Sequence, residues 1–383
     1  MQYQLAENIL TVNLEGKIDT SNADEISAEL LELAKKFPVE KFILNLKNLS
    51  YISSAGLRAV LRLSKLKKKN LQLIEASREV FEVFDTSGFT QIINIQKALR
   101  QISADNLIEL GRGTSGTVYK LDDENILKVY NANWNFEDVA RERANSQAAF
   151  VAGISTAISY DVVKVGESFG IVYEMIDANT LEKVMLEDTE HIEDYSQKFA
   201  EFVKEQHAIK TDFEDIKQHL ISNAEKISYY SADDLKIVRQ ILDAVPDSKN
   251  FCHCDLNFGN ILLQNGQMIM IDMGEIASGH PVFDLSWLYF MYVIRKKIIE
   301  EKGVKNPMGP KIIPDIVWKT FMQTYFNTKD EKAIAQYERA LLPYSLIQVL
   351  NASTTRPIPQ KACELYRNIL MAEVERGIIP IDF

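Results

Sequence analysis

A glycine-rich segment sets the strongest limit on what this chain can fold into. Residues 110–120 read LGRGTSGTVYK, with Gly111, Gly113 and Gly116 in the spacing G-x-G-x-x-G. Dinucleotide-binding folds use the same spacing, but there the glycines lead from a strand into a helix. Here the β-prone run TVYKL follows, then a polar turn and a second strand candidate, ILKVY, at 126–130. Because glycines let backbone approach phosphate oxygens closely, a glycine loop between two strands predicts a cover for nucleotide phosphates.

One lysine lies inside the second of these strands. Lys128 is surrounded by the apolar residues of ILKVY, and after a glycine loop of this kind we expect it to point into a cleft. A helix is predicted over 136–153, and a glutamate on it would hold Lys128 against the α- and β-phosphates. Glu142 is our choice for this role. Glu137 is the alternative, although its ordinary role would be to stabilise the first turn of the helix.

Residues 251–263 read FCHCDLNFGNILL and raise the question of a metal cluster. A closed structural zinc site needs four ligands, mostly cysteine or histidine. Cys252, His253 and Cys254 are consecutive, so neighbouring side chains point apart, and the only other cysteine in the sequence is Cys363. We therefore predict that this segment binds no zinc, that His253 supports a loop through hydrogen bonds, and that Cys252 packs in the core.

The same segment carries the spacing H-x-D-x-x-x-x-N, formed with Asp255 and Asn260. A further strand candidate, QMIMIDMG, contains Asp272 near its end. Two acids and an amide suit a site that holds a metal ion and a phosphate. We expect Asp255 to orient or deprotonate an acceptor hydroxyl. Asn260 and Asp272 would hold Mg²⁺, a hard ion that prefers oxygen ligands.

Composition bounds the class of protein. The chain has 383 residues, of which 46% are hydrophobic, which is enough for more than one core. Its net charge of -11 disfavours nucleic acid as a partner, because an acidic chain repels phosphate backbones. The longest nearly apolar run, at 285–294, is too short to span a bilayer, and the start MQYQLAENIL does not read as a signal peptide. With three cysteines and no disulfide framework, we expect a cytoplasmic protein.

The first hundred residues alternate between strand and helix patterns, which predicts a small α/β domain. Strands are expected at 9–14, 41–46 and 71–76, and helices at 22–36, 55–69 and from 77 onward. Ser53 and Ser54 stand where an N-cap is expected, before the second helix. Taken alone, this pattern favours two capping serines without a regulatory role.

Residues 1 to about 101 resemble a STAS domain of the anti-sigma-factor antagonist family. The resemblance is carried by LEGKIDTSNA at 14–23, by FILNLKNL, and by YISSAGLRAVL at 51–61. It implies that Ser54 occupies the position of the phosphorylated serine and that the domain binds an anti-sigma-factor-like or other protein partner. Ser53 and Asn45 stand where the family has acidic residues, whereas Asp19 is retained.

Residues 104–383 resemble the aminoglycoside phosphotransferase and choline kinase-like family, within the protein-kinase-like fold. The resemblance rests on LGRGTSGTVYK, ILKVY, HCDLNFGNILL and IDMGEIASGHPVFDLSWLY. It implies a bilobal α+β domain with a β-rich N-lobe at 104–176, a mainly helical C-lobe at 177–383, and ATP and Mg²⁺ as cofactors. Within it, Asp284 is expected to be structural.

The resemblance also places nucleotide contacts. Ser115 and Val118 would join the three glycines around the phosphates, and backbone groups of Glu174 and Ile176 would meet adenine at a hinge. The sequence departs from the family pattern at three positions that bear no catalytic group. Cys254 replaces a glycine before the catalytic aspartate, Phe258 replaces a proline, and Ala178 replaces a glycine after the hinge.

Together the two resemblances imply a bacterial-type regulatory protein that transfers the γ-phosphoryl of ATP to a hydroxyl of a small molecule. Two alternatives stay open at this point. The chain could be a kinase that acts on a STAS-domain serine, or a non-catalytic nucleotide sensor that acts through its STAS domain. No motif in 181–250 or 285–383, where the acceptor pocket is expected, names an acceptor.

Overall fold

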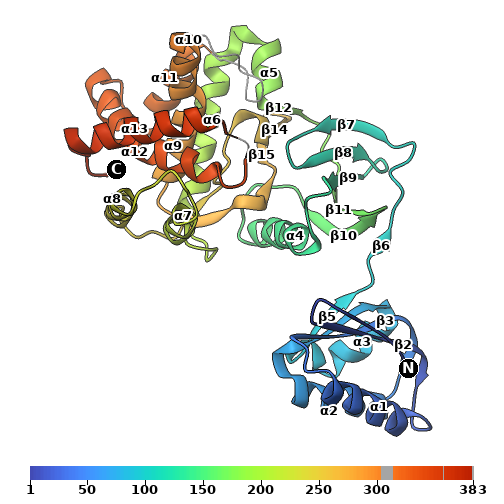
Figure 1. Cartoon of the computed structure of the whole chain (residues 1–383). Coiled ribbons are helices and arrows are strands. Elements are labelled where there is room, and N and C mark those ends of the chain that lie inside the picture. Colours follow the sequence, from blue (N-terminus) through green and yellow to red (C-terminus); the bar gives the residue numbers. More distant parts are fainter. Residues whose placement is uncertain (303–313, 357, 382–383) are drawn as a thin grey trace. The chain divides into compact units, whose positions relative to one another are not determined.

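The computed structural model describes residues 1–302, 314–356 and 358–381, and the side chains of 299–302 lie outside that description. The chain divides into two compact units, Met1–Ile102 and Ser103–Phe383 (Figure 1). Each unit has its own buried apolar cluster, and each is described by itself.

The first unit is built on a five-stranded sheet with the order β1-β2-β3-β4-β5. β1 is antiparallel to β2, and the other neighbours are parallel. The strands are β1 (Gln2–Ala6), β2 (Ile9–Ile18), β3 (Lys41–Ile52), β4 (Leu71–Ala76) and β5 (Asn94–Lys97). The helices are α1 (Ala23–Lys36), α2 (Ser54–Lys67) and α3 (Arg78–Thr86), with single 3₁₀ turns at Lys68–Asn70 and Phe89–Gln91 and a short strand β6 (Arg100–Gln101).

Strand β3 is longer than predicted. The sequence pattern indicated a strand at 41–46, but pairing with β2 continues to Ile52. The register shifts between Asn13 and Glu15, and again between Gly16 and Lys17. Because each shift breaks the period of two between buried and exposed side chains, the second half of the strand shows no alternation in the sequence.

The N-terminal part of the second unit is an antiparallel sheet in which β10, β11, β9, β8 and β7 follow one another. A single helix, α4, packs against β10 and β11. The elements are β7 (Ile108–Arg112), β8 (Gly116–Lys120), β9 (Asn125–Tyr130), α4 (Phe136–Val151), β10 (Ser159–Val165) and β11 (Ser168–Glu174). The glycine-rich segment thus lies between strands, as predicted.

The remainder of the second unit is mainly helical. Its helices are α5 (Leu181–Glu187), α6 (Ile192–Ala208), α7 (Ile216–Ala224), α8 (Ala232–Asp243), α9 (Val282–Tyr289), a π-helical turn (Phe290–Ile294), α10 (Arg295–Lys302), α11 (Asp315–Tyr325), α12 (Glu331–Ala352) and α13 (Gln360–Arg376). Its short strands are β12 (Asn179–Thr180), β13 (Asn250–Cys252), β14 (Ile261–Gln264), β15 (Gln267–Met270) and β16 (Ala277–Gly279).

Helix α9 lies at the centre of this lobe, because all eight of its residues are buried and α12 packs along it. In the described part of the chain, no helix combines the length and apolar character that a membrane crossing requires.

Candidate active site

Three charged side chains meet between the two lobes of the second unit. Lys128 on β9 places its Nζ 2.7 Å from Glu142 Oε1 on α4 and 2.7 Å from Asp272 Oδ1, which follows β15. Glu137, the alternative partner, lies exposed in the first turn of α4. The structure therefore brings together the lysine, the glutamate and one of the two proposed metal ligands.

Electrostatic attraction opposes the effect of burial in this group. Burial disfavours the ammonium of Lys128, but attraction to Asp272 and Glu142 outweighs it and raises the lysine pKa well above its usual range. Burial likewise opposes the carboxylate of Asp272, yet contact with Lys128 prevails and lowers its pKa. For Glu142 burial prevails over Lys128 and raises the pKa, so the Asp272 carboxylate is the member of the group whose charged form is favoured.

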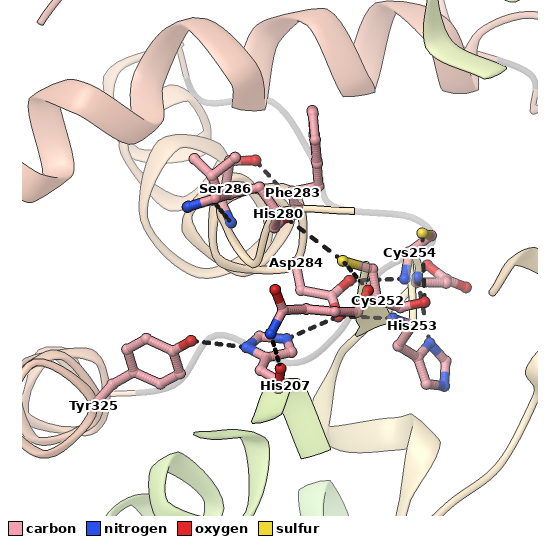
Figure 2. Close-up of polar contacts among 12 residues, drawn as sticks. His207, Cys252, His253, Cys254, His280, Phe283, Asp284, Ser286 and Tyr325 are labelled. Carbon is pink, nitrogen blue, oxygen red and sulfur yellow. Dashed lines mark hydrogen bonds and ion pairs between the residues drawn. The ribbon is translucent and has the colours of Figure 1, made fainter. Parts of the chain in front are cut away.

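The loop that carries Asp255 is held by a buried aspartate (Figure 2). The backbone N–H groups of His253 and Cys254 donate to Asp284 Oδ2 and Oδ1, both at 2.7 Å. His207 Nε2 lies 3.1 Å from Asp284 Oδ2, and its Nδ1 lies 2.8 Å from the Tyr325 hydroxyl. Burial disfavours the Asp284 carboxylate, but these donors outweigh burial and lower its pKa. Asp284, which the family resemblance marks as structural, thus fixes the backbone of the two residues directly before Asp255.

His253 connects the same loop to the strand end before Asp272. The N–H of Asp255 donates to His253 Nδ1 at 3.3 Å, so this nitrogen carries no proton. The proton then sits on Nε2, which donates to the carbonyl of Ile271 at 3.0 Å. The neutral tautomer set by these two bonds ties Asp255 and Asp272 to one framework.

The consecutive cysteine–histidine segment forms no cluster in the structure. Cys252 is buried, with Sγ 3.5 Å from the carbonyl of His280, and burial raises the thiol pKa of Cys252 and Cys254. Among the residues that the structure describes, no three histidine, cysteine, aspartate or glutamate side chains are grouped to hold a metal ion. Cys254 has φ 63°, the left-handed region that favours glycine, which is the residue the family pattern has there.

Asn260 lies at the other end of the loop. Its side-chain Nδ2 donates to the backbone carbonyl of Asp255 at 2.9 Å, and its backbone carbonyl accepts from the N–H of Ile271 at 3.0 Å. Because the amide nitrogen is engaged in this way, Oδ1 is the atom suited to a cation. Asp272, which has φ 68°, was predicted to hold Mg²⁺ with Asn260, and both side chains carry the oxygen atoms that this ion prefers.

The three glycines of the loop play different parts. A Cβ on Gly116 would lie 2.1 Å from the carbonyl oxygen of Val129, so the β8–β9 pairing itself requires glycine. A Cβ on Gly111 or Gly113 would meet nothing within 4 Å, which leaves open space beside the loop. The carbonyl of Ser115 accepts from the N–H of Asn131 at 3.0 Å, which anchors the tip of the loop.

Val118 pairs with Lys128 across β8 and β9, so both lie at the same level of the sheet.

At the end of β11, the N–H of Glu174 donates to the carbonyl of Ile158 at 3.0 Å, and Glu174 Oε1 accepts from the N–H of Ile158 at 2.7 Å. Ile176 and Ile126 both pack against the apolar cluster of the N-lobe. The end of β11 is thus fixed by Ile158, the residue directly before β10, and the predicted adenine contact at Ile176 lies beside apolar side chains.

Sequence reasoning missed one side chain at this site. Arg356, in the turn after α12, places Nη2 3.1 Å from Asp255 Oδ2. Burial raises the pKa of Asp255, and Arg356 only partly counters this effect. No motif surrounds the arginine in the sequence, so only the packing of the C-terminal helices shows the contact.

In the first unit, Ser53 is the N-cap of α2, and its Oγ accepts from the N–H of Gly56 at 3.4 Å. Ser54 is the first residue of the helix and is exposed. Asp19 accepts hydrogen bonds from Ser21, which lower its pKa, and Asn45 Nδ2 donates to Asn13 at 3.1 Å. Ser53 therefore caps the helix, whereas Ser54 presents an exposed hydroxyl.

Comparison with known proteins gives the same division of the chain. The family model described as "STAS domain" matches residues 1–102, and the model described as "Phosphotransferase enzyme family" matches residues 106–301. The first part is 35% identical over 101 residues to a putative anti-sigma factor antagonist, BtrV, of Bordetella bronchiseptica, covering 26% of this chain and 86% of that protein. It is 33% identical over 92 residues to the anti-sigma-B factor antagonist of Bacillus subtilis, covering 23% and 83%.

Among solved structures, ADP-bound aminoglycoside phosphotransferase APH(2'')-Ib is similar at 16% identity and a TM-score of 0.45, covering 78% of this chain and 99% of that chain. Unphosphorylated SpoIIAA, an anti-sigma factor antagonist, is similar at 22% identity and a TM-score of 0.23, covering 24% and 85%. The family matches confirm the predicted fold class of both parts. The chain belongs to the phosphotransferase enzyme family, and its first 102 residues form a STAS domain of the anti-sigma-factor antagonist type.

Proposed function

We propose that this chain transfers the γ-phosphoryl group of ATP to a hydroxyl of a small molecule, with Mg²⁺ as cofactor, and that its STAS domain binds a protein partner. The observation that carries the proposal is the convergence of Lys128, Glu142 and Asp272 at 2.7 Å, with the Asp255 loop tied to the same strand end. Such an arrangement suits phosphoryl transfer, in which positioning and charge neutralisation supply most of the catalysis.

The geometry supports the following roles. Lys128 would hold the α- and β-phosphates, and Glu142 would keep its ammonium in place. The open space beside Gly111 and Gly113 would let backbone approach the phosphates. Asn260 and Asp272 would hold Mg²⁺, which when bound neutralises charge on the transferred phosphate.

Asp255 would orient the acceptor hydroxyl and take its proton. The O–H bond of the acceptor breaks, its oxygen forms a bond to the γ-phosphorus, and the bond from that phosphorus to the β–γ bridging oxygen breaks to release ADP. Because burial raises the pKa of Asp255, its carboxylate is a better proton acceptor than an exposed aspartate.

Nucleotide binding is the first test. If ATP·Mg²⁺ binds the second unit, its thermal transition should rise, and a ligand at a hundred times its Kd stabilises by about 2.7 kcal/mol. Lys128→Ala should reduce this increment. The control is Lys120→Ala, since Lys120 lies on the adjacent strand β8 but pairs with Asp123 at 2.7 Å.

Transfer is the second test. With labelled ATP and a panel of hydroxyl compounds, the wild type should phosphorylate at least one acceptor. Asp255→Asn should keep the nucleotide-induced stabilisation and lose the transfer, because Asp255 acts on the acceptor and not on the nucleotide. Absence of any thermal shift at millimolar ATP·Mg²⁺ would contradict the proposed function.

For the STAS domain we propose Ser54 as the phosphoacceptor. The supporting observation is that its hydroxyl is exposed at the first residue of α2, where free N–H groups and the helix dipole favour a phosphate. Peptide mapping of protein from its native cell should find phosphate on Ser54, and Ser54→Asp should recover less partner than the wild type. Phosphate on Ser53 alone would contradict this assignment. Label from ATP that stays on Ser54 would favour the alternative of a kinase acting on its own STAS domain.

A further inference from the structure

A positive charge stands next to the carboxylate that would meet the acceptor. Arg356 Nη2 lies 3.1 Å from Asp255 Oδ2, and the arginine side chain is 42% exposed. A guanidinium has five N–H donors in a planar fork, so one contact with Asp255 leaves donors for a second anion. The exposed fraction means that solvent, and hence a ligand, reaches this group.

Arg356 is held in place from two sides. Its backbone N–H donates to the carbonyl of Ala352 at 2.8 Å, and its backbone carbonyl accepts from the N–H of Ile358 at 2.9 Å. Its guanidinium lies 5.4 Å from the ring centre of Trp287, a residue of the buried helix α9. A cation over an indole face is stabilised by the ring. The side chain of Arg356 is therefore held beside the loop that carries Asp255, residues 253–260, which we call the catalytic loop.

A second arginine, Arg295, follows a helical turn that contacts the loop carrying Asp255. The hydroxyl of Tyr292 accepts from the N–H of Phe258 at 2.9 Å, which places the π-helical turn Phe290–Ile294 against the catalytic loop. Arg295 follows this turn directly and interacts electrostatically with Tyr292, as do Asp255 and Glu182. π-Helical turns inside α-helices occur often at functional sites.

The charged groups near Asp255 have different roles in the proposed reaction. In the proposed reaction Asp255 accepts a proton and Asp272 holds the metal, so neither carboxylate is available to bind a charged group of the acceptor. Arg356, which contacts Asp255 at 3.1 Å, is a charged group that can do so. A polycationic or quaternary-ammonium acceptor would meet a fixed positive charge beside the reacting hydroxyl, whereas an anionic one would meet a partner.

We propose that Arg356 selects an acceptor that carries an anionic group, a carboxylate or a phosphate ester, close to the hydroxyl that is phosphorylated. This inference rests on the proposed phosphotransferase function and names its substrate class. On binding, the anion of the acceptor pairs with the guanidinium, and the Asp255 carboxylate turns from Arg356 to the hydroxyl. Until an anionic acceptor binds, Asp255 remains paired with Arg356.

The test uses the full chain with saturating ADP·Mg²⁺, so that the nucleotide phosphate site is filled. Four probes share one three-carbon frame: glycerate, glycerol 3-phosphate, glycerol and 3-amino-1,2-propanediol. Their affinities are measured by calorimetry. At least one of the two anions should bind ten or more times tighter than glycerol, and the amine should bind no better than glycerol. The two anionic arms distinguish a carboxylate acceptor from a phosphate ester.

Variants decide whether Arg356 is the cause. Arg356→Gln should remove the preference for the anion, and Arg356→Glu should reverse it in favour of the amine. Arg239→Gln is the matched control, because Arg239 also pairs with a carboxylate, that of Glu225 at 2.8 Å, but on α8. It should leave the preference unchanged.

The contrary results are distinct. Equal affinity for all four probes, or an anion preference that persists in Arg356→Gln, would overturn the inference. A uniform loss of affinity for all probes in Arg356→Gln would show that the arginine only holds the loop, and would overturn it too. If ADP·Mg²⁺ itself gives no thermal shift with the wild type, the proposed function fails and this inference fails with it. If nucleotide binds and the charge preference is absent, this inference fails alone.

Discussion

Replacing Asp284 by asparagine tests whether one buried carboxylate holds the catalytic loop. The side chain is fully buried and accepts the N–H groups of His253 and Cys254 at 2.7 Å each, with His207 at 3.1 Å. Asparagine has nearly the same shape, but one of its two terminal atoms is a donor. That NH₂ group would face a backbone N–H, so one bond is lost and two donors oppose each other.

The cost can be set from these contacts. Hydrogen bonds to a charged group contribute about 1.5–3 kcal/mol each, and breaking a buried charged network costs about 3–5 kcal/mol. We therefore expect Asp284→Asn to lower the free energy of unfolding of the second unit by about 3–5 kcal/mol. At roughly 2–4 °C per kcal/mol for a large domain, its transition should fall by about 6–20 °C.

The dependence on pH has a definite sign. The pKa of Asp284 is lowered in the folded state, so its carboxylate contributes stability that is fully present above the unfolded value of about 3.9. This contribution is lost as pH falls from there through the folded pKa. The difference between wild type and Asp284→Asn should thus be constant at neutral pH and shrink only below about pH 4.

Scanning calorimetry of the full chain measures both effects, and the STAS domain serves as an internal control because it has a separate core. Asp212→Asn is the matched variant, since Asp212 is 92% exposed and pairs with Lys249 at 2.6 Å; it should cause no resolvable change. A loss below about 1 kcal/mol for Asp284→Asn, or an equal shift in the STAS transition, would refute the reasoning.

Three further outcomes are expected. Gly116→Ala should lower the second transition strongly, because its Cβ would lie 2.1 Å from a backbone oxygen, whereas Gly113→Ala should spare the fold and reduce stabilisation by ATP·Mg²⁺; calorimetry with and without nucleotide separates them. Ser53→Ala should destabilise the STAS domain by about 1 kcal/mol through loss of the N-cap, and Ser54→Ala should not, as chemical denaturation will show. Protein purified without added zinc should contain well under one equivalent by elemental analysis, and stoichiometric zinc that disappears in Cys254→Ser would contradict this.

The parts of the site that sequence could predict are those fixed by local pattern. Lys128 stands inside an apolar strand after a glycine loop, and Glu142 lies on the buried side of the helix that follows. Each of these positions depends on a short segment and on the order of elements along the chain. The structure then shows what the pattern does not, that Asp272 shares the same ammonium with Glu142.

Arg356 could not have been predicted, because its contact with Asp255 joins segments far apart in the sequence and depends on how α12 packs along α9. The backbone donors to Asp284 were hidden for a related reason, since N–H groups leave no mark in the sequence. Cys254 is an intermediate case. The sequence showed that Cys254 stands where the family has glycine, but it did not show the backbone conformation. The φ of 63° shows that the loop keeps a conformation favoured by glycine despite the cysteine side chain.

The STAS domain and the phosphotransferase unit each have a buried core of their own. Over the described residues, the buried cluster of the STAS domain and those of the phosphotransferase unit have no member in common. Each unit therefore has the apolar interior that a domain needs in order to fold by itself.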